Sequence, residues 1–480
     1  MASHALPAAA GAGVSPTRTF SVLLLVAAVA CGVLAIRTTD SAKAGSSSVA
    51  TPDAPAWSAR RVPQPIVDAV GAQRLQAALD ATAAGTDSCF LVDEGGAPLA
   101  SHNSDAPLVP ASTQKLLTAS TALAVLGPET TLDTRVMAAH APDGGTVDRL
   151  FLVGGGDPLL FTPDAQALRD EIPELRGSAT TSLAALADSI VAAGVKRVPK
   201  GIAADDSRYE TLRYLPTWKE SYRTGGEVGP LGALTVNGGF SALRPRPVPV
   251  EDPAVFAAEK LGELLEARGV DIGRSPTREV APPGAVEVAK VSSPPLADVV
   301  GEEISTSDNL GSELLTREIG LRASEQGTTA AGTQAILAKL GELGVPTANT
   351  TVVDGSGLDR GNRATCSLLL GAFELGARPE FAALWNGLAV AGQRGTLIDQ
   401  IGGDLTGKVR GKTGTLDGVT ALVGIVDAGR PLRFAFLANG GFTEQAGIAL
   451  RGRIAQAIAT FPDSPSADEL VPQPTTSAQP

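Results

Sequence analysis

Ser112 and Lys115 stand three residues apart in the stretch VPASTQKLLTAS (residues 109–120), where an apolar helix is expected to begin. Positions i and i+3 share one face of a helix, so the two side chains would point the same way. A lysine whose charge is destabilised can act as base for a serine nucleophile, and the free N–H groups at a helix start favour negative charge on the serine oxygen. Serine is also a good N-cap, and an S-x-x-K spacing arises by chance on the order of once in a chain of this length. Alone, the pair supports a capped surface helix better than a catalytic site.

Two further motifs change this balance. An S-D-N triplet occupies residues 307–309, where one expected helix ends and another begins, and K-T-G-T occupies residues 412–415 on an expected strand. Taken singly, they are typical of a polar turn or helix cap and of an exposed edge strand. Each triplet is expected by chance in roughly one chain in ten or fewer of this size. The three motifs together, in this order, therefore indicate a serine acyl-transfer enzyme.

The motif set resembles the penicillin-recognising serine acyltransferases. Five further runs look like those of the D-alanyl-D-alanine carboxypeptidase/endopeptidase family, the low-molecular-mass penicillin-binding proteins of DacB type. These runs are LFLVGGGDPLL (150–160), ADDSRYE (204–210), GALTVNGG (232–239), VVDGSGLDRGNRAT (352–365) and VAGQRGTL (390–397). The resemblance covers residues 65–461. We interpret the glycine-rich runs at 154–158 and 354–357 as turns that shape the fold.

The resemblance implies a role for each motif residue. Ser112 would be the acylated nucleophile and Lys115 its general base. Ser307 would relay a proton to the leaving amine, and Asn309 would hold the substrate amide and Lys115. Lys412 would supply positive charge to Ser307 and to the terminal carboxylate of the substrate. Apart from the resemblance, a buried lysine that faces a second lysine has a lowered pKa, which would let Lys115 act as a base.

The K-T-G-T strand would bind the substrate. The hydroxyls of Thr413 and Thr415 would donate hydrogen bonds to its carboxylate, with Gly414 between them, and the backbone N–H groups of Ser112 and Thr415 would form the oxyanion hole. Acyl transfer from an anionic peptide end needs these parts whatever the family: a nucleophile, a base, an oxyanion hole and a cation. Asp308 is expected to be structural.

The implied function is that of an exported serine D-Ala-D-Ala carboxypeptidase or endopeptidase that acts on peptidoglycan stem peptides, is inhibited by β-lactams and needs no cofactor. One alternative is a serine β-lactamase, but the Glu-x-x-Leu-Asn element that class A enzymes use between S-D-N and K-T-G is not found here. A second alternative is a non-catalytic wall-binding protein of the same fold. Binding alone would not require Ser112 or Lys115.

Composition excludes other classes. The 480 residues carry a formal net charge of −12, which argues against a nucleic-acid partner because phosphate binding needs a basic face. Of the three histidines, only His102 and His140 lie in the expected folded region, without zinc-binding spacing and without a G-x-S-x-G motif. A zinc peptidase and a Ser-His-Asp hydrolase are therefore disfavoured, and we expect no metal.

The elements that must position the motifs come from both ends of the chain. We expect a helix at 65–85, a hairpin at 88–103, an antiparallel meander of three strands at 407–440 and an amphipathic helix at 443–461 capped by Thr443. This predicts an α/β (α+β) fold of the serine β-lactamase/D,D-peptidase type, an antiparallel sheet flanked by helices. The middle of the chain, with its short strands and proline turns, predicts an inserted, mostly β module that accounts for the roughly 195 residues between the first two motifs.

The termini have a different composition. The 17 residues from Phe20 to Ile36 are charge-free and apolar, which indicates export or anchoring in a membrane. The expected location is the outer face of the cytoplasmic membrane, the periplasm or the cell wall. The predicted organisation is an export signal or anchor at 1–44, a flexible linker at 45–64, the catalytic domain at 65–129 and 296–461, the inserted module at 130–295 and a disordered tail at 462–480. Cys89 and Cys366 are either a disulfide, which we slightly favour in an oxidising compartment, or two buried thiols.

Overall fold

A six-stranded antiparallel sheet joins the two ends of the folded chain. The computed structural model describes residues 64–463. The strand order of the sheet is β14-β15-β16-β17-β1-β2, so that strands from the C-terminal part lie beside the first two strands of the chain. Its strands are β1 (Asp87–Glu94), β2 (Ala97–His102), β14 (Ala389–Val390), β15 (Val409–Leu416), β16 (Val419–Asp427) and β17 (Pro431–Asn439). The expected hairpin and three-stranded meander are confirmed.

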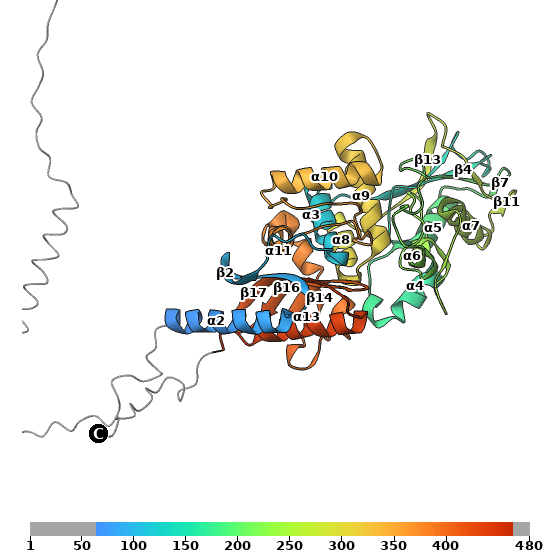
Figure 1. Ribbon diagram of the computed structural model, residues 1–480. Coiled ribbons are helices and arrows are strands. Elements are labelled where there is room, and N and C mark those ends of the chain that lie inside the picture. Colours follow the sequence, from blue (N-terminus) through green and yellow to red (C-terminus); the bar gives the residue numbers. More distant parts are fainter. Residues whose placement is uncertain (1–63, 464–480) are drawn as a thin grey trace, which may run out of the picture. The chain divides into compact units, whose positions relative to one another are not determined.

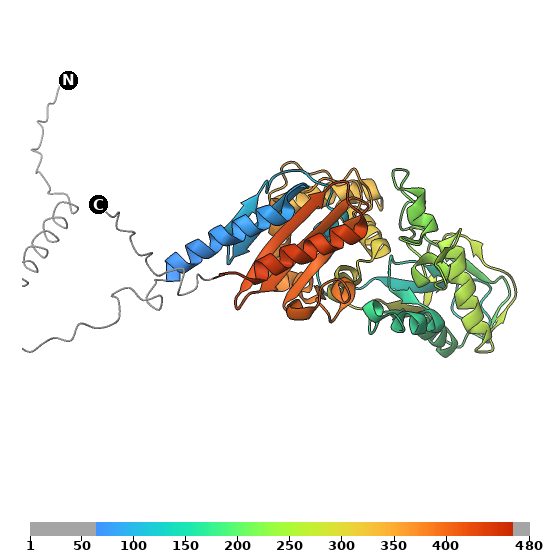
Figure 2. The same cartoon turned by 60° about the horizontal axis from the view of Figure 1, so that its bottom comes forward.

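Successive side chains along a strand point to opposite faces of the sheet, and here both faces are apolar. On β16, Leu422 and Val426 belong to one buried cluster, whereas Ala421 and Val423 belong to another. This follows from the two-residue repeat of a strand. Helices α2 (Gln64–Ala83) and α13 (Glu444–Ala459) lie side by side across the first face (Figures 1 and 2). Thr443 caps α13 by accepting a hydrogen bond from the Ala446 N–H, as expected.

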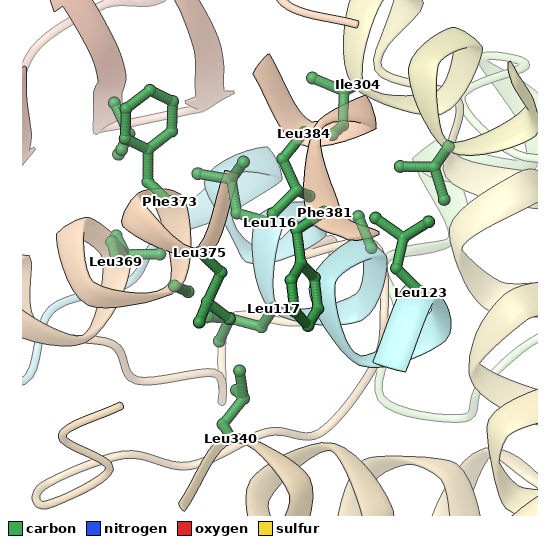
Figure 3. Packing of buried hydrophobic residues seen from close by; sticks show 14 of the residues in the cluster. Leu116, Leu117, Leu123, Ile304, Leu340, Leu369, Phe373, Leu375, Phe381 and Leu384 are labelled. Atoms are coloured by element: carbon green, nitrogen blue, oxygen red, sulfur yellow. The ribbon is translucent and has the colours of Figure 1, made fainter. Parts of the chain in front are cut away.

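The second face is covered by helices, among them α3, the helix that follows the S-x-x-K serine. Leu116 and Leu117 of α3 (Lys115–Leu126) belong to one buried cluster with Phe373 and Leu384, and all four side chains are fully buried (Figure 3). Burying a leucine of this kind stabilises the fold by roughly 2 kcal/mol. The other helices of this part are α8 (Leu296–Thr306), α9 (Asn309–Ser324), α10 (Thr329–Glu342), α11 (Cys366–Glu374) and α12 (Ala383–Asn386).

Residues 133–292 form a second sheet with its own core. Its strand order is β12-β8-β4-β3-β13, and the strands are β3 (Asp133–Ala138), β4 (Leu150–Val153), β8 (Ile202–Asp205), β12 (Thr277–Arg278) and β13 (Val286–Ser292). The short remaining strands are β5 (Leu160–Phe161), β6 (Thr181–Ser182), β7 (Arg197–Val198), β9 (Phe240–Ala242), β10 (Val248–Pro249) and β11 (Asp271–Ile272).

The short strands and proline turns predicted a mostly β module, but this segment contains helices as well as strands. It also holds α4 (Pro163–Asp170), α5 (Leu183–Ala192), α6 (Glu220–Thr224) and α7 (Pro253–Glu266). Helices α5 and α7 bury leucines at helical spacing in the core of the second sheet, for example Leu183 and Leu186, and Leu261 and Leu265. These two stretches have helical periodicity, but the prediction gave more weight to the short strands and turns around them.

A disulfide between Cys89 on β1 and Cys366 at the start of α11 links the sheet to the helices of its second face. The two cysteines are 277 residues apart in the sequence, and both are fully buried. A disulfide of this kind is consistent with an extracytoplasmic location.

The predicted export segment and nearly all of the predicted linker and tail lie outside the described residues. None of the helices between residues 64 and 463 is both long enough and apolar enough to cross a membrane.

Candidate active site

Ser112 lies on a short 3-10 turn, Ala111–Gln114, that runs directly into α3 at Lys115. The N-cap positions of the turn and of the helix are Pro110 and Gln114, so Ser112 caps neither element. Ala111 has a φ of +47°, in the left-handed region that costs a non-glycine residue energy. The interpretation of the S-x-x-K pair as a capped surface helix is therefore wrong, because Ser112 caps neither element and residues 115–123 of α3 are buried.

Lys115 is the centre of a buried hydrogen-bond cluster. Its side chain is fully buried, and its Nζ lies 3.1 Å from Oγ of Ser112. Nζ also donates to Oδ1 of Asn309 and to the backbone carbonyl oxygen of Ser356, both at 2.6 Å. The last two partners can only accept hydrogen bonds at these oxygens. A neutral amine would therefore direct its two N–H bonds to Asn309 and Ser356 and its lone pair to the Ser112 hydroxyl.

Burial lowers the pKa of Lys115 to about 8. Removing the ammonium group from water disfavours its charged form, and the surrounding carboxylates, of which Glu303 and Asp354 act most strongly, oppose that shift. The sequence argument expected both burial and a second lysine to lower this pKa. Burial is the largest cause, and the packing around α3 therefore favours the neutral amine that a base requires.

The S-D-N motif forms the junction between two helices, as expected. Ser307 ends α8 with a φ of +64°, Asp308 is the N-cap residue of α9, and Asn309 is its first residue. Nδ2 of Asn309 donates to the backbone carbonyl oxygen of Glu227 at 2.8 Å. This bond fixes the amide so that its oxygen faces Lys115.

Lys412 of β15 reaches from the sheet to Ser307. Its Nζ donates to Oγ of Ser307 and to the carbonyl oxygen of Thr413, each at 2.8 Å, and the side chain is fully buried. Burial and the positive charge of Lys115 lower the pKa of Lys412 well below its usual value. Because Lys412 donates to the Ser307 oxygen, the Ser307 proton is free to be donated to another group.

Glycines allow the motifs to approach each other. A Cβ at Gly414 would lie 2.7 Å from the carbonyl oxygen of Pro110 and 3.2 Å from the backbone N of Thr113, so only glycine lets β15 pack against the serine turn. Gly357 has a φ of +86°, and a Cβ there would collide with the carbonyl oxygen of Ala111. Both glycines bring strand and loop backbone to the turn that carries Ser112.

The two threonines of K-T-G-T have different partners. Oγ1 of Thr413 lies 2.9 Å from Oγ1 of Thr396. Oγ1 of Thr415 accepts a hydrogen bond from the guanidinium of Arg451 at 2.7 Å. Their contacts with a substrate carboxylate, and the oxyanion hole formed with the backbone N–H groups of Ser112 and Thr415, stay predictions.

Sequence reasoning missed the groups that hold Lys115 in place. The glycine-rich turn at 354–357 was interpreted as structural, yet its Ser356 carbonyl bonds Lys115. Buried Glu313 accepts hydrogen bonds from the N–H groups of Gly355 and Ser356 at 3.0 and 2.7 Å and so orients this turn. The DGSG run was a visible signal for the turn, but nothing in the sequence marks the carbonyl of Glu227.

The described residues contain no cluster of side chains that could hold a metal ion. The fold is that of the penicillin-recognising serine enzymes, and Ser112 and Lys115 lie together as the S-x-x-K motif of that class requires.

Comparison with known proteins identifies the family within this class. The model of the D-Ala-D-Ala carboxypeptidase 3 (S13) family matches residues 74–247 and 241–461, and the chain belongs to this family. The protein is a serine-type D-Ala-D-Ala carboxypeptidase that acts on peptidoglycan. The resemblance to this family and the predicted carboxypeptidase activity are confirmed.

Relatives and solved structures agree with this assignment. The chain is 31% identical over 345 residues to a carboxypeptidase of Mycobacterium tuberculosis, covering 70% of this chain and 72% of the relative. It is 31% identical over 361 residues to carboxypeptidase DacB of Mycolicibacterium smegmatis, covering 72% and 74%. Penicillin binding protein 4 (dacB) of Haemophilus influenzae has the same fold, with a TM-score of 0.66 at 20% identity, covering 80% of this chain and 98% of that structure.

Proposed function

We propose that this carboxypeptidase works at the outer face of the cytoplasmic membrane, in the periplasm or in the cell wall, through an acyl-enzyme on Ser112. The observation that carries the proposal is the geometry of Lys115. It is fully buried, its pKa is lowered to about 8, and its two shortest contacts go to acceptors, which leaves its lone pair for the Ser112 hydroxyl 3.1 Å away.

The proposed reaction starts with proton transfer. Lys115 takes the proton of Ser112, whose oxygen forms a bond to the carbonyl carbon of the penultimate D-alanine. The C–N bond to the terminal D-alanine then breaks, and Ser307 relays to the leaving amine the proton that Lys115 took from Ser112, so that Lys115 is neutral again. A water molecule hydrolyses the resulting ester by the same route in reverse, with Lys115 again accepting a proton. Lys412 keeps the Ser307 oxygen in place during both steps.

The residues 130–295 are proposed to form a module inserted into the catalytic domain at 65–129 and 296–461. Support comes from the sheet and the apolar core that this part of the chain forms from its own residues. A free peptide end and a D,D cross-link each present a D-alanine carbonyl in an amide bond, and the same centre could cleave both, so we propose endopeptidase activity as well. Muropeptide analysis with the purified protein measures both products.

We also propose that β-lactams acylate Ser112. The Haemophilus influenzae penicillin binding protein 4 has been solved in complex with a β-lactam. The test is the intact mass of the protein after incubation with benzylpenicillin, for the wild type and for Ser112→Ala. A single adduct on the wild type that is lost in the variant supports the proposal, and an adduct that persists in Ser112→Ala contradicts it.

Nitrocefin distinguishes a peptidase from a β-lactamase. A peptidase of this kind is expected to give a stoichiometric, long-lived adduct, because no Glu-x-x-Leu-Asn element is available to speed deacylation. Rapid multiple turnover of nitrocefin would instead assign the site to a β-lactamase.

A further inference from the structure

Arg451 of α13 is a buried cation that the three motifs do not include. Its side chain is fully buried, and no carboxylate within residues 64–463 lies within ion-pair distance of its guanidinium. The one carboxylate whose charge affects its pKa is Glu444, which opposes the lowering by burial. Buried charges are normally paired because leaving water is costly. An unpaired guanidinium at this position therefore calls for an explanation.

The polar contacts of Arg451 point at the K-T-G-T strand. Nη1 donates to Oγ1 of Thr415 at 2.7 Å and to the carbonyl oxygen of Gly414 at 3.1 Å. Nη2 donates to Oε1 of Gln400, which fixes the plane of the guanidinium. Its Nε is buried without a partner. All of its bonds inside the described part of the chain thus go to neutral oxygen atoms.

The direction of the bond to Thr415 has a chemical consequence. A guanidinium has no acceptor atom, so the Thr415 oxygen must accept and its own proton must be donated elsewhere. Thr415 is only partly buried, whereas Arg451 is fully buried behind it. The hydroxyl proton is therefore available to an acceptor on the open side of β15.

We propose that Arg451 is a positioning residue for the terminal carboxylate of the substrate: it locks the Thr415 hydroxyl as a donor and supplies the buried positive charge that the carboxylate neutralises. This inference rests on the proposed function, in which the K-T-G-T strand binds the peptide end. It gives the enzyme a means to prefer a peptide with a free carboxylate over one whose end is blocked.

The charge of Arg451 suits this role better than that of Lys412 alone. Two of the three Lys412 protons are already used on Ser307 and Thr413. Burial lowers the pKa of Arg451 only to about 10, so the guanidinium stays charged at neutral pH. The positive charge of Arg451 also contributes to the lowered pKa of Lys412. The two cations are therefore close enough to act on the same anion.

The test compares two substrates cut at the same bond, diacetyl-L-Lys-D-Ala-D-Ala and its C-terminal amide. The readout is the ratio of kcat/KM for the acid to kcat/KM for the amide, a ratio that a general loss of folded enzyme does not change. Charged hydrogen bonds to a carboxylate are strong, so Arg451→Gln is expected to lower the ratio about tenfold or more. Arg451→Lys keeps the charge and is expected to restore part of it.

Thr415→Val provides the matched variant on the strand. It removes the hydroxyl and is expected to lower the same ratio, and the double variant with Arg451→Gln should fall short of the product of the two single effects. Thermal unfolding reports whether each variant folds. If Arg451→Gln does not fold, the acid-to-amide ratio of kcat/KM is measured for Arg451→Lys and Thr415→Val, and a lowered ratio in these two variants supports the role of Arg451.

Two results would overturn the inference. One is an unchanged acid-to-amide ratio in the folded variants, and the other is a double variant whose effect equals the product of the single effects. Failure of the proposed function looks different, because the wild type itself would then form no adduct with benzylpenicillin and its Ser112→Ala variant would still cleave both peptides.

Discussion

Replacing Asn309 by aspartate would put a charged oxygen where Lys115 now meets an amide oxygen at 2.6 Å. The two side chains have nearly the same shape, so the substitution changes charge far more than volume. A negative charge next to Lys115 stabilises its protonated form and raises its pKa. The base that accepts the Ser112 proton would then be lost at neutral pH.

The size of the effect can be estimated from the distance. Two unit charges about 4 Å apart interact by about 4 kcal/mol at an effective dielectric constant of 20, and measured shifts from one neighbouring charge are about 1–3 pKa units. Burial sets the starting pKa of Lys115 at about 8. At pH 7 the neutral fraction of Lys115, and with it the acylation rate, should fall about 10- to 1,000-fold.

The assay is the second-order rate of acylation by benzylpenicillin, followed by intact mass at a series of pH values. For the wild type, the rate should rise with pH and level off above about 8, because Lys115 loses its proton through this range. For Asn309→Asp, the rise should move to higher pH, so the deficit shrinks as the pH increases. Asn309→Ala removes the amide without adding charge and should lower the plateau without moving the rise upward.

The reasoning fails if Asn309→Asp lowers the rate by the same factor at every pH. That result would mean that Asn309 matters for holding the substrate or the Glu227 carbonyl, and that the protonation of Lys115 does not limit acylation. A wild-type rate that does not change between pH 6 and 9 would contradict the assignment of Lys115 as the base.

Three further predictions concern packing and stability. Gly414→Ala should push β15 away from the serine turn, cost about 1–3 kcal/mol of stability and slow benzylpenicillin acylation at least tenfold. The control is Gly452→Ala on α13, where a Cβ meets no neighbour; this variant should leave the acylation rate unchanged. Replacing Cys89 and Cys366 together by alanine should lower the free energy of unfolding in urea by about 5 kcal/mol, since the bridge closes a 277-residue loop, and a double variant as stable as the wild type would contradict this. Burial raises the pKa of Asp157 to about 6, so its ionisation makes the wild type lose stability as the pH rises from about 4 to 6. Asp157→Asn should remove this loss and be up to about 3 kcal/mol more stable than the wild type at pH 7.5, as measured by urea unfolding. If the free energy of unfolding depends on pH equally in the two proteins, the raised pKa of Asp157 is contradicted.

Side-chain chemistry could be predicted from the sequence, because the motifs name residue types and their order. The strands of the meander, the cap at Thr443 and the helix junction at Ser307 were likewise readable from apolar spacing and capping residues. Backbone groups could not be predicted, since any residue can supply the carbonyls that Glu227 and Ser356 provide.

The remaining errors have physical causes of the same kind. Ser112 looked like a helix cap because serine favours that position, but it lies inside the 3-10 turn that precedes α3, and the cap positions are Pro110 and Gln114. Helices α5 and α7 were overlooked because short strands and turns flank each of them. Arg451 lies in an ordinary amphipathic helix pattern, and its role depends on which strand that helix covers.

Burial has opposite consequences for the cations of this site. Lys115 must lose a proton to act as a base, and burial, which lowers the pKa of Lys115 to about 8, makes that possible near neutral pH. The same burial also weakens the protonation of Lys412, the cation expected to meet the substrate carboxylate. A guanidinium starts from a pKa high enough to keep its charge at the same depth, as Arg451 does. One buried site can thus hold a neutral base and a positive charge together, because lysine and arginine respond differently to the same loss of water.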